Sequence, residues 1–594
     1  FDDYNYNLLG FALSGPILKK RNSDGTQGSS IVGYFLSGEL RSVDDTDPSA
    51  IGMWKVKDDV LQNLRENPFV LAPNANAGLL SSSEFLRESD FELVDAKLNT
   101  NDKRINISGK LDFKPSKNTF LALGGSFYGR KSSDFSYWRS MFSWDDNRIS
   151  SQTTYRLFGK LTQKFGSDES NSEESASTIK NAFFTIQGDY TNNKYTYGDS
   201  RNGENIFDYG YVGKFNTYKA PIYDDGIAVD SLTGTIYNGQ VLTGWADTLY
   251  TFNPANTNPS LVNYTSAYYQ MFQENGLNSY MAPTMASFGV DASNDGVIRT
   301  AADLQGIGIM NGGYPPSVYS LFGNHGYWYG ASIKQENTQL SFKASGSADI
   351  KSHEFSFGFE YEQRDDYYWQ FNAYESVWGL MNQLANKHIL ERDLANPQPV
   401  FDANGIFQDT INYDRLFVAD EQSDFDRNLR IQLGLNPNGI DFVDIDSYDP
   451  STYSINLFSP DELLNNGTEF VYYYGYDIYG NKPKERPTLA QFFDEGSSRL
   501  IPSFNPVYTA GYIQDKFAID DLIFNVGLRV DRYDANQKVL KDQHLLYAAY
   551  TAGENTSLID GTNIPSTIGG DYVVYVDDIE SPSAIVGYRD NSDD

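Results

Sequence analysis

Oxygen-bearing side chains stand at alternate positions of VDASNDGVIRTAAD, residues 290–303, in a spacing that suits calcium chemistry. A calcium loop supplies oxygen ligands from its first, third and fifth positions, with glycine sixth and an acidic residue twelfth. Here Gly296 is in sixth place, and the acidic residue comes one place late. The candidate ligands are Asp291, Ser293, Asp295 and Asp303. We expect either a calcium ion in this loop or an Asx-rich turn without metal.

No group of residues in the sequence indicates a catalytic site. FDANGIFQD, residues 401–409, begins like the calcium pattern but has less to support it. Cysteine is absent, and the chain has no GxSxG, GxxxxGKS or HExxH motif. The histidines are scattered without metal-ligand spacing, and we expect loop or interface roles for His325, His353, His388 and His544. We therefore predict no enzymatic activity, and no cofactor besides calcium in that one loop.

A larger set of polar side chains recurs at every second position of segments that alternate like β-strands. Successive side chains of a strand point to opposite faces, so residues two apart share a face. The polar set consists of Lys110, Asp112, Gln187, Asp189, Lys343, Asp349, Glu354, Glu360, Glu362, Arg529 and Asp531. These side chains either act on a solute in a wet interior or simply solvate that interior.

The opposite faces of the same segments are apolar. EFSFGFEYEQ, residues 354–363, carries an aromatic residue at every second position, with glutamates between them. The apolar set consists of Ile105, Ile107, Leu111, Phe184, Ile186, Phe355, Phe357, Phe359, Tyr361, Phe524, Val526 and Leu528. A soluble sandwich would bury this face in a core, whereas a membrane barrel would turn it toward lipid tails.

The way in which the strands are joined favours the membrane barrel. The predicted strands are 8–17, 31–40, 104–113, 119–130, 155–165, 181–190, 339–350, 354–363, 508–517 and 522–533. Tight turns at KPSKN, IKSH and AIDD alternate with much longer connections. Outer-membrane barrels have short periplasmic turns and long extracellular loops, and a tilted strand of about ten residues spans their apolar band of roughly 25 Å. We therefore predict an all-β, transmembrane antiparallel β-barrel with very long extracellular loops.

Composition restricts the partners. A net charge of −33 and a pI near 4.4 argue against nucleic acid, and favour cationic or metal-bearing ligands over polyanions. The 43 tyrosines and 38 phenylalanines are strand formers. No run of about 18 apolar residues is present, so no transmembrane helix is expected. The chain opens without methionine or a signal peptide, and we read it as processed, truncated or partial.

Several segments carry a family resemblance: GFALSGPILKK (10–20), FDYGYVGKF (207–215), FGFEYEQR (357–364), GYIQDKF (511–517) and NVGLRVDRYD (525–534). They resemble the barrel of TonB-dependent outer-membrane receptors, and most of all the large Oar-like group of Bacteroidota. The resemblance implies roughly 22 strands around a plugged lumen. This chain would hold about the first ten, without the TonB box, the plug or the closing strands. The polar set would line the lumen, and the apolar set would face lipid.

This resemblance divides the chain into strand-bearing segments and loops. The strand-bearing segments are 1–40 (plug–barrel junction and first hairpin), 104–194 (barrel strands), 338–365 (hairpin) and 507–534 (hairpin). The extracellular loops are 41–103, 195–337, 366–506 and 535–594. The loops are rich in Tyr, Asn, Gly and Asp, for example in 311–330 and 470–481, and we expect them to form an adaptable surface that captures a ligand.

The expected function is transport across the outer membrane of a Gram-negative bacterium. External loops would bind a solute, and the resemblance implies that a TonB-type energy-coupling protein opens the plugged lumen. Outer-membrane lipid would surround the barrel, and a surface lipoprotein is a further candidate partner. Two alternatives remain open: an adhesion or secretion-associated scaffold anchored by the same barrel, and a soluble extracellular β-protein that binds glycans.

Overall fold

The computed structural model describes residues 4–71, 79–165, 179–274, 310–493, 498–537, 549–554, 564–578 and 581–590. The chain divides into two units. The first contains Phe1–Phe504 and Tyr508–Arg532, and the second contains Asn505–Val507 and Tyr533–Asp594.

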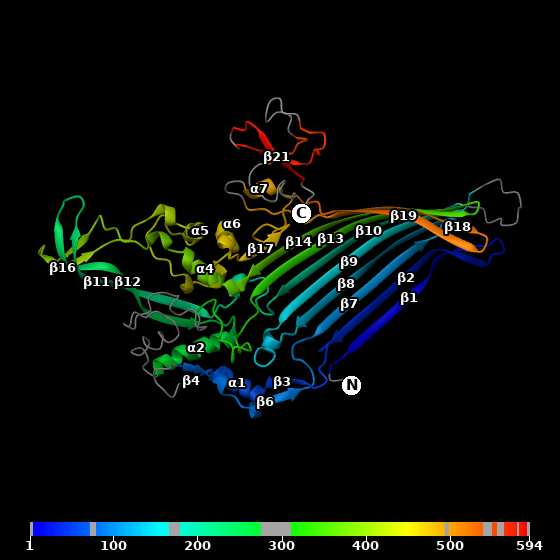
Figure 1. Ribbon diagram of the computed structural model, residues 1–594. Coiled ribbons are helices and arrows are strands. Elements are labelled where there is room, and N and C mark those ends of the chain that lie inside the picture. Colours follow the sequence, from blue (N-terminus) through cyan, green and yellow to red (C-terminus); the bar gives the residue numbers. More distant parts are fainter. Residues whose placement is uncertain are drawn as a thin grey trace. The chain divides into compact units, whose positions relative to one another are not determined.

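The first unit is built around an eleven-stranded sheet whose strands follow chain order, except that β17 pairs with β14 (Figure 1). The strands are β1 (Asn7–Arg21), β2 (Gln27–Val43), β7 (Asp102–Phe113), β8 (Thr119–Asp134), β9 (Arg148–Phe165), β10 (Ile179–Gly198), β13 (Ala331–Ile350), β14 (His353–Asn372), β17 (Val471–Tyr474), β18 (Val507–Ile519) and β19 (Leu522–Asp534). All pairings from β1 to β14 are antiparallel. Every strand predicted from the sequence lies in this sheet, which confirms the all-β antiparallel architecture.

The strands run further than the alternation predicts. β13 and β14 contain 20 residues each. Alternation ends near Gln363, but β14 continues to Asn372 because Trp369 and Phe371 pair with β17 and are buried. Pairing with neighbouring strands, rather than sequence period, therefore sets the strand ends.

Short and long connections are segregated, as predicted. In an antiparallel meander, alternate connections lie at opposite ends of the sheet. The links between β1 and β2, β7 and β8, β13 and β14, and β18 and β19 are tight and share one end, the short-turn end. The longer links, such as 373–506 between β14 and β18, share the other end.

The apolar band lies oblique to the strands. On β7 the band begins with Ile105. We can follow the residues that lie directly opposite Ile105 from strand to strand. They are Gly129, Thr153, Lys194, Glu336 and finally Tyr367 of β14. On β14, however, the alternating apolar residues end at Tyr361, nearer the short-turn end. The band thus slides along successive strands, as it must when strands tilt across an apolar layer.

The long connections fold into a structured region rather than open loops. Their helices are α1 (Asp58–Glu66), α2 (Pro259–Glu274), α4 (Val377–Leu384), α5 (Asp424–Gln432), α6 (Pro460–Leu464) and α7 (Leu489–Phe493). Their strands are β3 (Met53–Val56), β4 (Phe69–Leu71), β5 (Leu79–Ser81), β6 (Phe91–Val94), β11 (Gly213–Val229), β12 (Ile236–Pro254), β15 (Gln398–Phe401) and β16 (Phe407–Asn412). β11, β12, β16 and β15 form a separate four-stranded sheet, in which β12 and β16 are parallel.

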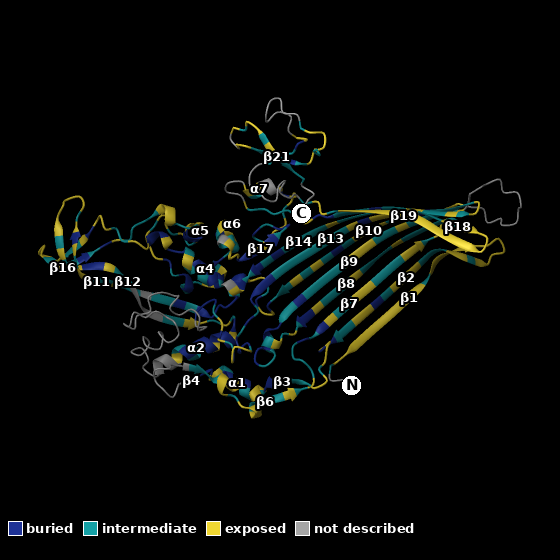
Figure 2. Ribbon diagram, viewed as in Figure 1, coloured by how far each residue is buried: buried dark blue, intermediate teal, exposed yellow. Residues whose placement is uncertain are grey.

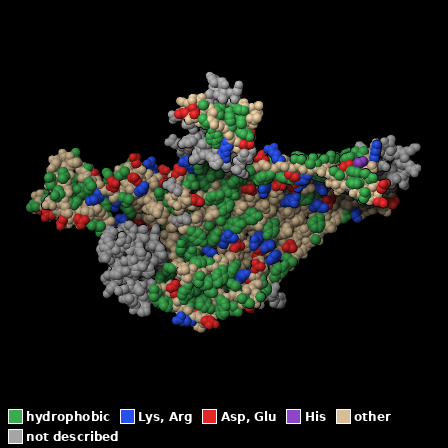
Figure 3. Space-filling view, viewed as in Figure 1, with side chains coloured by type: hydrophobic (Ala, Val, Ile, Leu, Met, Phe, Trp, Pro, Cys, Tyr) green, Lys and Arg blue, Asp and Glu red, His purple; other side chains and the backbone are tan. Residues whose placement is uncertain are grey.

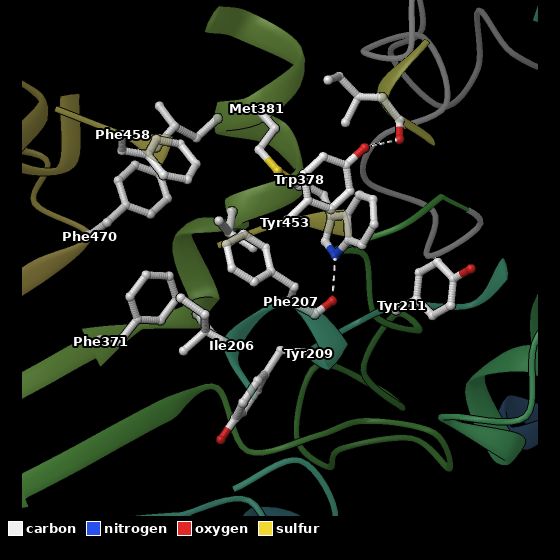
Figure 4. Close-up of a cluster of buried hydrophobic side chains, with 14 of the residues drawn as sticks. Ile206, Phe207, Tyr209, Tyr211, Phe371, Trp378, Met381, Tyr453, Phe458 and Phe470 are labelled. Atoms are coloured by element: carbon white, nitrogen blue, oxygen red, sulfur yellow. Dashed lines mark hydrogen bonds between the residues drawn. The ribbon is translucent and has the colours of Figure 1, made fainter. Parts of the chain in front are cut away.

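One hydrophobic cluster joins three of these connections, and we call it the connection core. It contains Phe69, residues between Ile206 and Trp328, and residues between Trp369 and Ile478. Figure 4 shows Trp378 and Tyr453 at its centre, with Phe207, Tyr211 and Met381 around them. In Figure 2 the buried residues gather around α2 and α4, whereas the edge strands β1 and β19 are largely exposed.

The connection core contains two segments that the sequence analysis discussed. FDYGYVGKF resembles the family's barrel but lies in the predicted connection 195–337, where Phe207, Tyr209 and Phe215 are buried in the connection core. Tyr473 and Ile478, from a segment expected to form a contact surface, are buried there too. Aromatic side chains bury large apolar areas, so a tyrosine-rich segment can supply a core as readily as a surface.

The second unit carries a two-stranded antiparallel sheet of β20 (Val573–Val576) and β21 (Ile585–Arg589). None of the helices among the described residues is long and apolar enough to cross a bilayer.

Candidate functional site

The predicted polar set shares one face of the large sheet, the polar face: strand register places its members from β7 to β14, and the contact of Arg529 with Glu360 places those of β19. Asp112, Ala122, Lys160, Gln187, Lys343 and Glu360 form one continuous cross-strand row from β7 to β14. Asp189 and Glu362 lie in the neighbouring row, with Ser341 of β13 between them. Residues distant in the sequence therefore meet along rows perpendicular to the strands.

Charges on the polar face pair across strands. Lys343 contacts Glu360, its direct register partner on β14. Glu360 also lies 3.7 Å from Arg529 of β19. Arg529 donates to Asp531 at 3.0 Å and to the hydroxyl of Tyr508 at 2.8 Å. This group gives the polar face a charged cluster with both signs near β14 and β19.

Asp189 has a partner that the sequence analysis did not single out. Arg156 of β9 forms an ion pair with its carboxylate, and Gln187 donates to the same carboxylate at 2.9 Å. Arg156 sits at an alternating position of its strand, so alternation could have placed it on the polar face, whereas the register of β9 and β10 brings it to Asp189.

The remaining polar residues have local partners. Lys110 lies 2.9 Å from Asp112, and Lys516 lies 3.3 Å from Glu354. Asn181 donates to Asp349 at 2.6 Å. Such half-exposed pairs contribute at most about 1 kcal/mol each, so they arrange charge more than they stabilise the sheet.

An open hollow of about 710 Å³ lies on the polar face at the short-turn end. Its lining brings together lysines of four strand or turn segments: Lys19, Lys110, Lys114 and Lys160. Asp112 is the acidic residue among the lining side chains. The hollow shows that the polar face is concave where β1, β2, β7, β8 and β9 meet.

The predicted apolar set shares the opposite face, the apolar face. Phe357 is 53 % exposed, Val526 60 % and Leu528 67 %. Neighbours on the same face, including Leu157 and Leu340, are also exposed. Among the described residues no second sheet covers this face. In water such a surface would be unfavourable by roughly 25 cal/mol for each Å² of apolar area.

The two calcium-like segments differ in outcome. Asp291, Ser293, Asp295 and Asp303 lie outside the described residues, so calcium there stays a prediction. In the second segment Asp402 accepts hydrogen bonds from the backbone amides of Asn404 at 2.9 Å and Ile406 at 2.8 Å. Those bonds lower the Asp402 pKa and make an Asx turn. In the described parts of the chain no three His, Asp or Glu side chains are grouped to hold a metal.

The three histidines in the described part of the chain do not converge. His325 and His388 are buried among the long connections. His353 lies at the short-turn end, with Nδ1 2.7 Å from Asp515. His544 is outside the described residues. Burial lowers the pKa of His325 to about 3, with a smaller contribution from Arg65.

A buried carboxylate ties two connections together. Asp446 accepts hydrogen bonds from the side-chain amides of Asn311 and Asn382, both at 2.9 Å. Burial raises the Asp446 pKa to about 6, although these two bonds oppose the shift. These hydrogen bonds join the segments around Asn311, Asn382 and Asp446. We therefore assign the Asp446 carboxylate a structural role.

Comparison with known proteins gives solved structures but no family. No protein-family model matches the chain, and no curated protein matches it. FpvA of P. aeruginosa, solved with a pyoverdine and iron, is 9% identical over 89% of this chain and 36% of its own, with a TM-score of 0.29. The outer membrane transporter YddB from Escherichia coli is 8% identical over 89% of this chain and 34% of its own, with a TM-score of 0.28.

The siderophore receptor PiuA from Acinetobacter baumannii is 10% identical over 88% of this chain and 49% of its own, with a TM-score of 0.24. This chain therefore spans between about a third and a half of the length of these three proteins.

Proposed function

We propose that the large sheet is part of an outer-membrane β-barrel and that the protein transports a solute across the outer membrane of a Gram-negative bacterium. The apolar face contacts lipid tails, and the polar face lines the lumen. The long connections lie outside the cell, and the tight turns lie in the periplasm. Each of these statements can be tested separately.

The exposed apolar face carries the proposal. Phe357, Leu340 and Leu528 lie on a face that a soluble sandwich would bury against a second sheet. Lipid satisfies the same side chains without a second layer. The oblique course of the apolar band supports tilted, membrane-spanning strands.

The edges of the sheet support a closed structure. β1 and β19 each pair with one strand of the described sheet, and both are exposed along most of their length. Unpaired backbone groups are very costly in lipid, so each edge needs a partner strand. We infer that further strands close the barrel between β19 and β1.

Energy coupling rests on the resemblance to TonB-dependent receptors. In this proposal an inner-membrane motor acts through a plug, and the paired charges of the polar face contact the plug or the solute. The Oar-like assignment, a surface lipoprotein partner and calcium in residues 290–303 belong to the same proposal.

The chain contains no cysteine, so single cysteine substitutions can report its topology. Thr233 lies in the β11–β12 link among the long connections, and Ser116 lies in a tight turn; both are exposed. In intact cells a membrane-impermeant maleimide should label Thr233→Cys and should reach Ser116→Cys only after the cells are broken. Labelling of both in intact cells, or recovery of the protein in the aqueous phase without detergent, would refute the barrel.

A scaffold that uses the barrel as an anchor is the second candidate. It is favoured by the connection core, because three connections share one hydrophobic core and can together present a binding surface. A transporter should lose solute uptake when the energy-coupling motor is deleted. A scaffold should keep its surface binding in the same strain.

A further inference from the structure

Three arginines stand side by side on the polar face. Arg41 of β2 is directly opposite Arg104 of β7, and Arg104 is directly opposite Arg130 of β8. We call these residues the arginine row. The chain has 79 acidic and only 46 basic residues, yet Figure 3 shows Lys and Arg side chains gathered over the sheet. Like charges directly opposite each other destabilise a sheet, so the row needs an explanation.

One buried carboxylate accounts for part of this charge. Asp102 is 1 % exposed and accepts hydrogen bonds from Arg104 through Nε at 2.5 Å and Nη2 at 3.0 Å. It also accepts one from Nε of Arg130 at 2.6 Å. A single carboxylate therefore serves two guanidinium groups, which leaves excess positive charge and fixes the orientation of both side chains.

Arg41 has no carboxylate partner among the described residues. Its guanidinium lies over the ring of Tyr6, with 5.5 Å between the guanidinium carbon and the ring centroid. Its Nε is buried without a hydrogen-bond partner in the described part of the chain. Glu39 lies on the same face of β2, but the two side chains form no ion pair. Arg41 thus adds a positive charge that nothing in its described surroundings neutralises.

The arginine row is open to a ligand. The side chains of Arg104 and Arg130 are 33 % and 35 % exposed, above the buried Asp102. The row continues from Arg130 to Gln152, which donates to the hydroxyl of Tyr195 at 2.8 Å. The nearby carboxylate of Asp134 is already held by Arg148 at 2.6 Å. The exposed surface of the row is therefore made of hydrogen-bond donors.

We propose that the arginine row binds a small solute that carries two or more oxyanion groups, either carboxylates or phosphates. The guanidinium fork matches the geometry of both groups and binds them through paired hydrogen bonds. Neighbouring strands lie about 4.8 Å apart, so the three positions extend over roughly 10 Å and suit a multiply charged solute better than a single small anion. This differs from the preference for cationic ligands that total charge suggests.

Placing the site on a solute pathway rests on the proposed function, whereas anion binding itself does not. The row lies near the ends of β7 and β8 from which the long connections leave. In a barrel with those connections outside the cell, the row would meet the solute before it reaches the mixed charges around Lys343 and Glu360. The binding test in detergent and the topology test in cells can therefore give a negative result independently of each other.

Calorimetric titration of the purified full chain in detergent, at low salt, tests the site with citrate and inorganic triphosphate as separate probes. Arg41→Gln leaves the Asp102 pairs intact and should weaken binding by roughly tenfold or more, because charged hydrogen bonds are lost. Asp102→Asn should strengthen binding, because Arg104 and Arg130 are released toward the ligand. Arg427→Gln, on the exposed surface of α5, is the matched control and should leave binding unchanged.

Weakening by Arg41→Gln together with strengthening by Asp102→Asn would support the site, and the better probe would identify the oxyanion class. Equal loss in the Arg41 and Arg427 variants would show general charge attraction and would overturn the proposal. Absence of binding by both probes to the unmodified chain would overturn it too. If Asp102→Asn does not fold, the Arg41 and Arg427 variants still decide between these outcomes.

Discussion

The indole Nε1 of Trp378 donates a hydrogen bond of 3.1 Å to the backbone carbonyl of Phe207 (Figure 4). This bond joins two long connections that are separated along the chain by two strands of the large sheet, β13 and β14. Tyr453 packs edge-on against the same indole at 5.5 Å between ring centroids. The connections therefore share one core instead of forming independent loops.

Trp378→Ala should destabilise the connection core by about 3–5 kcal/mol, because it removes a fully buried aromatic side chain and leaves a cavity. The measurement is the denaturant midpoint at which a protease begins to cut within 366–506. Trp54→Ala is the control, since Trp54 is 46% exposed. Equal protease sensitivity in both variants would contradict a shared core.

Gly312→Ala should disrupt the N-terminus of α4. Gly312 has φ of +83°, and a Cβ there would lie 2.2 Å from Oγ of Ser376. Ser376 caps α4 by accepting a hydrogen bond from the amide of Gly379 at 3.2 Å. Gly405→Ala is the matched control, because Gly405 has φ of +80° with nothing near its missing Cβ. We expect a larger drop in thermal midpoint for Gly312→Ala, and equal drops would assign the whole effect to backbone strain.

Asp446 should make the connection core less stable as pH rises. Its pKa is raised from 3.8 to about 6, so the folded protein keeps a proton that the unfolded chain has lost. The free energy of unfolding should fall between these two pH values, by about 3 kcal/mol in total. Asp446→Asn should remove this slope in denaturant titrations from pH 4 to 7, whereas exposed Asp420→Asn should retain it. An unchanged slope in Asp446→Asn would refute this assignment.

His325 should act in the opposite direction. Its pKa is lowered from 6.5 to about 3, so on acidification the unfolded chain takes up a proton before the folded protein does. Stability should therefore be fully present above pH 6.5 and be lost progressively as pH falls toward 3. His325→Leu should reduce this loss of stability at acidic pH. His353→Gln should not, because the His353 side chain is 41% exposed. If His325→Leu loses stability at acidic pH as much as the unmodified protein does, another buried group is responsible.

The sequence predicted the sheet well because the alternation within each strand shows which of its residues share a face. Phe355, Phe357 and Phe359 alternate with polar residues, and a one-residue slip would reverse both faces. The connection core carries no comparable period, because its contacts join segments distant in sequence. One element had a local signal that was missed: α2 begins with Pro259 and buries Leu261, Tyr264 and Tyr268 at helical spacing.

The ion pairs of the polar face also depend on contacts that the sequence period does not predict. Lys343 and Glu360 could be assigned to one face from alternation, but their direct opposition depends on the register of β13 and β14. Arg104 shares a face of β7 with Asp102, two residues away, whereas Arg130 is brought to Asp102 by the register of β7 and β8. Alternation predicts which face a residue occupies, whereas pairing decides which residue it meets.

Phe357→Arg distinguishes lipid from water at the apolar face. Phe357 is 53% exposed, so in water its replacement by a charged residue should change stability little. In a bilayer the same change should cost about 2–4 kcal/mol near the midplane. The measurement is the free energy of unfolding of the protein reconstituted in lipid vesicles. Ser356→Arg is the matched control, because Ser356 is the adjacent residue on the polar face, where a wet lumen can solvate the new charge. A large loss for Phe357→Arg with a small one for Ser356→Arg follows only if the two faces meet different solvents, and similar losses for both would refute the assignment of faces to lipid and lumen.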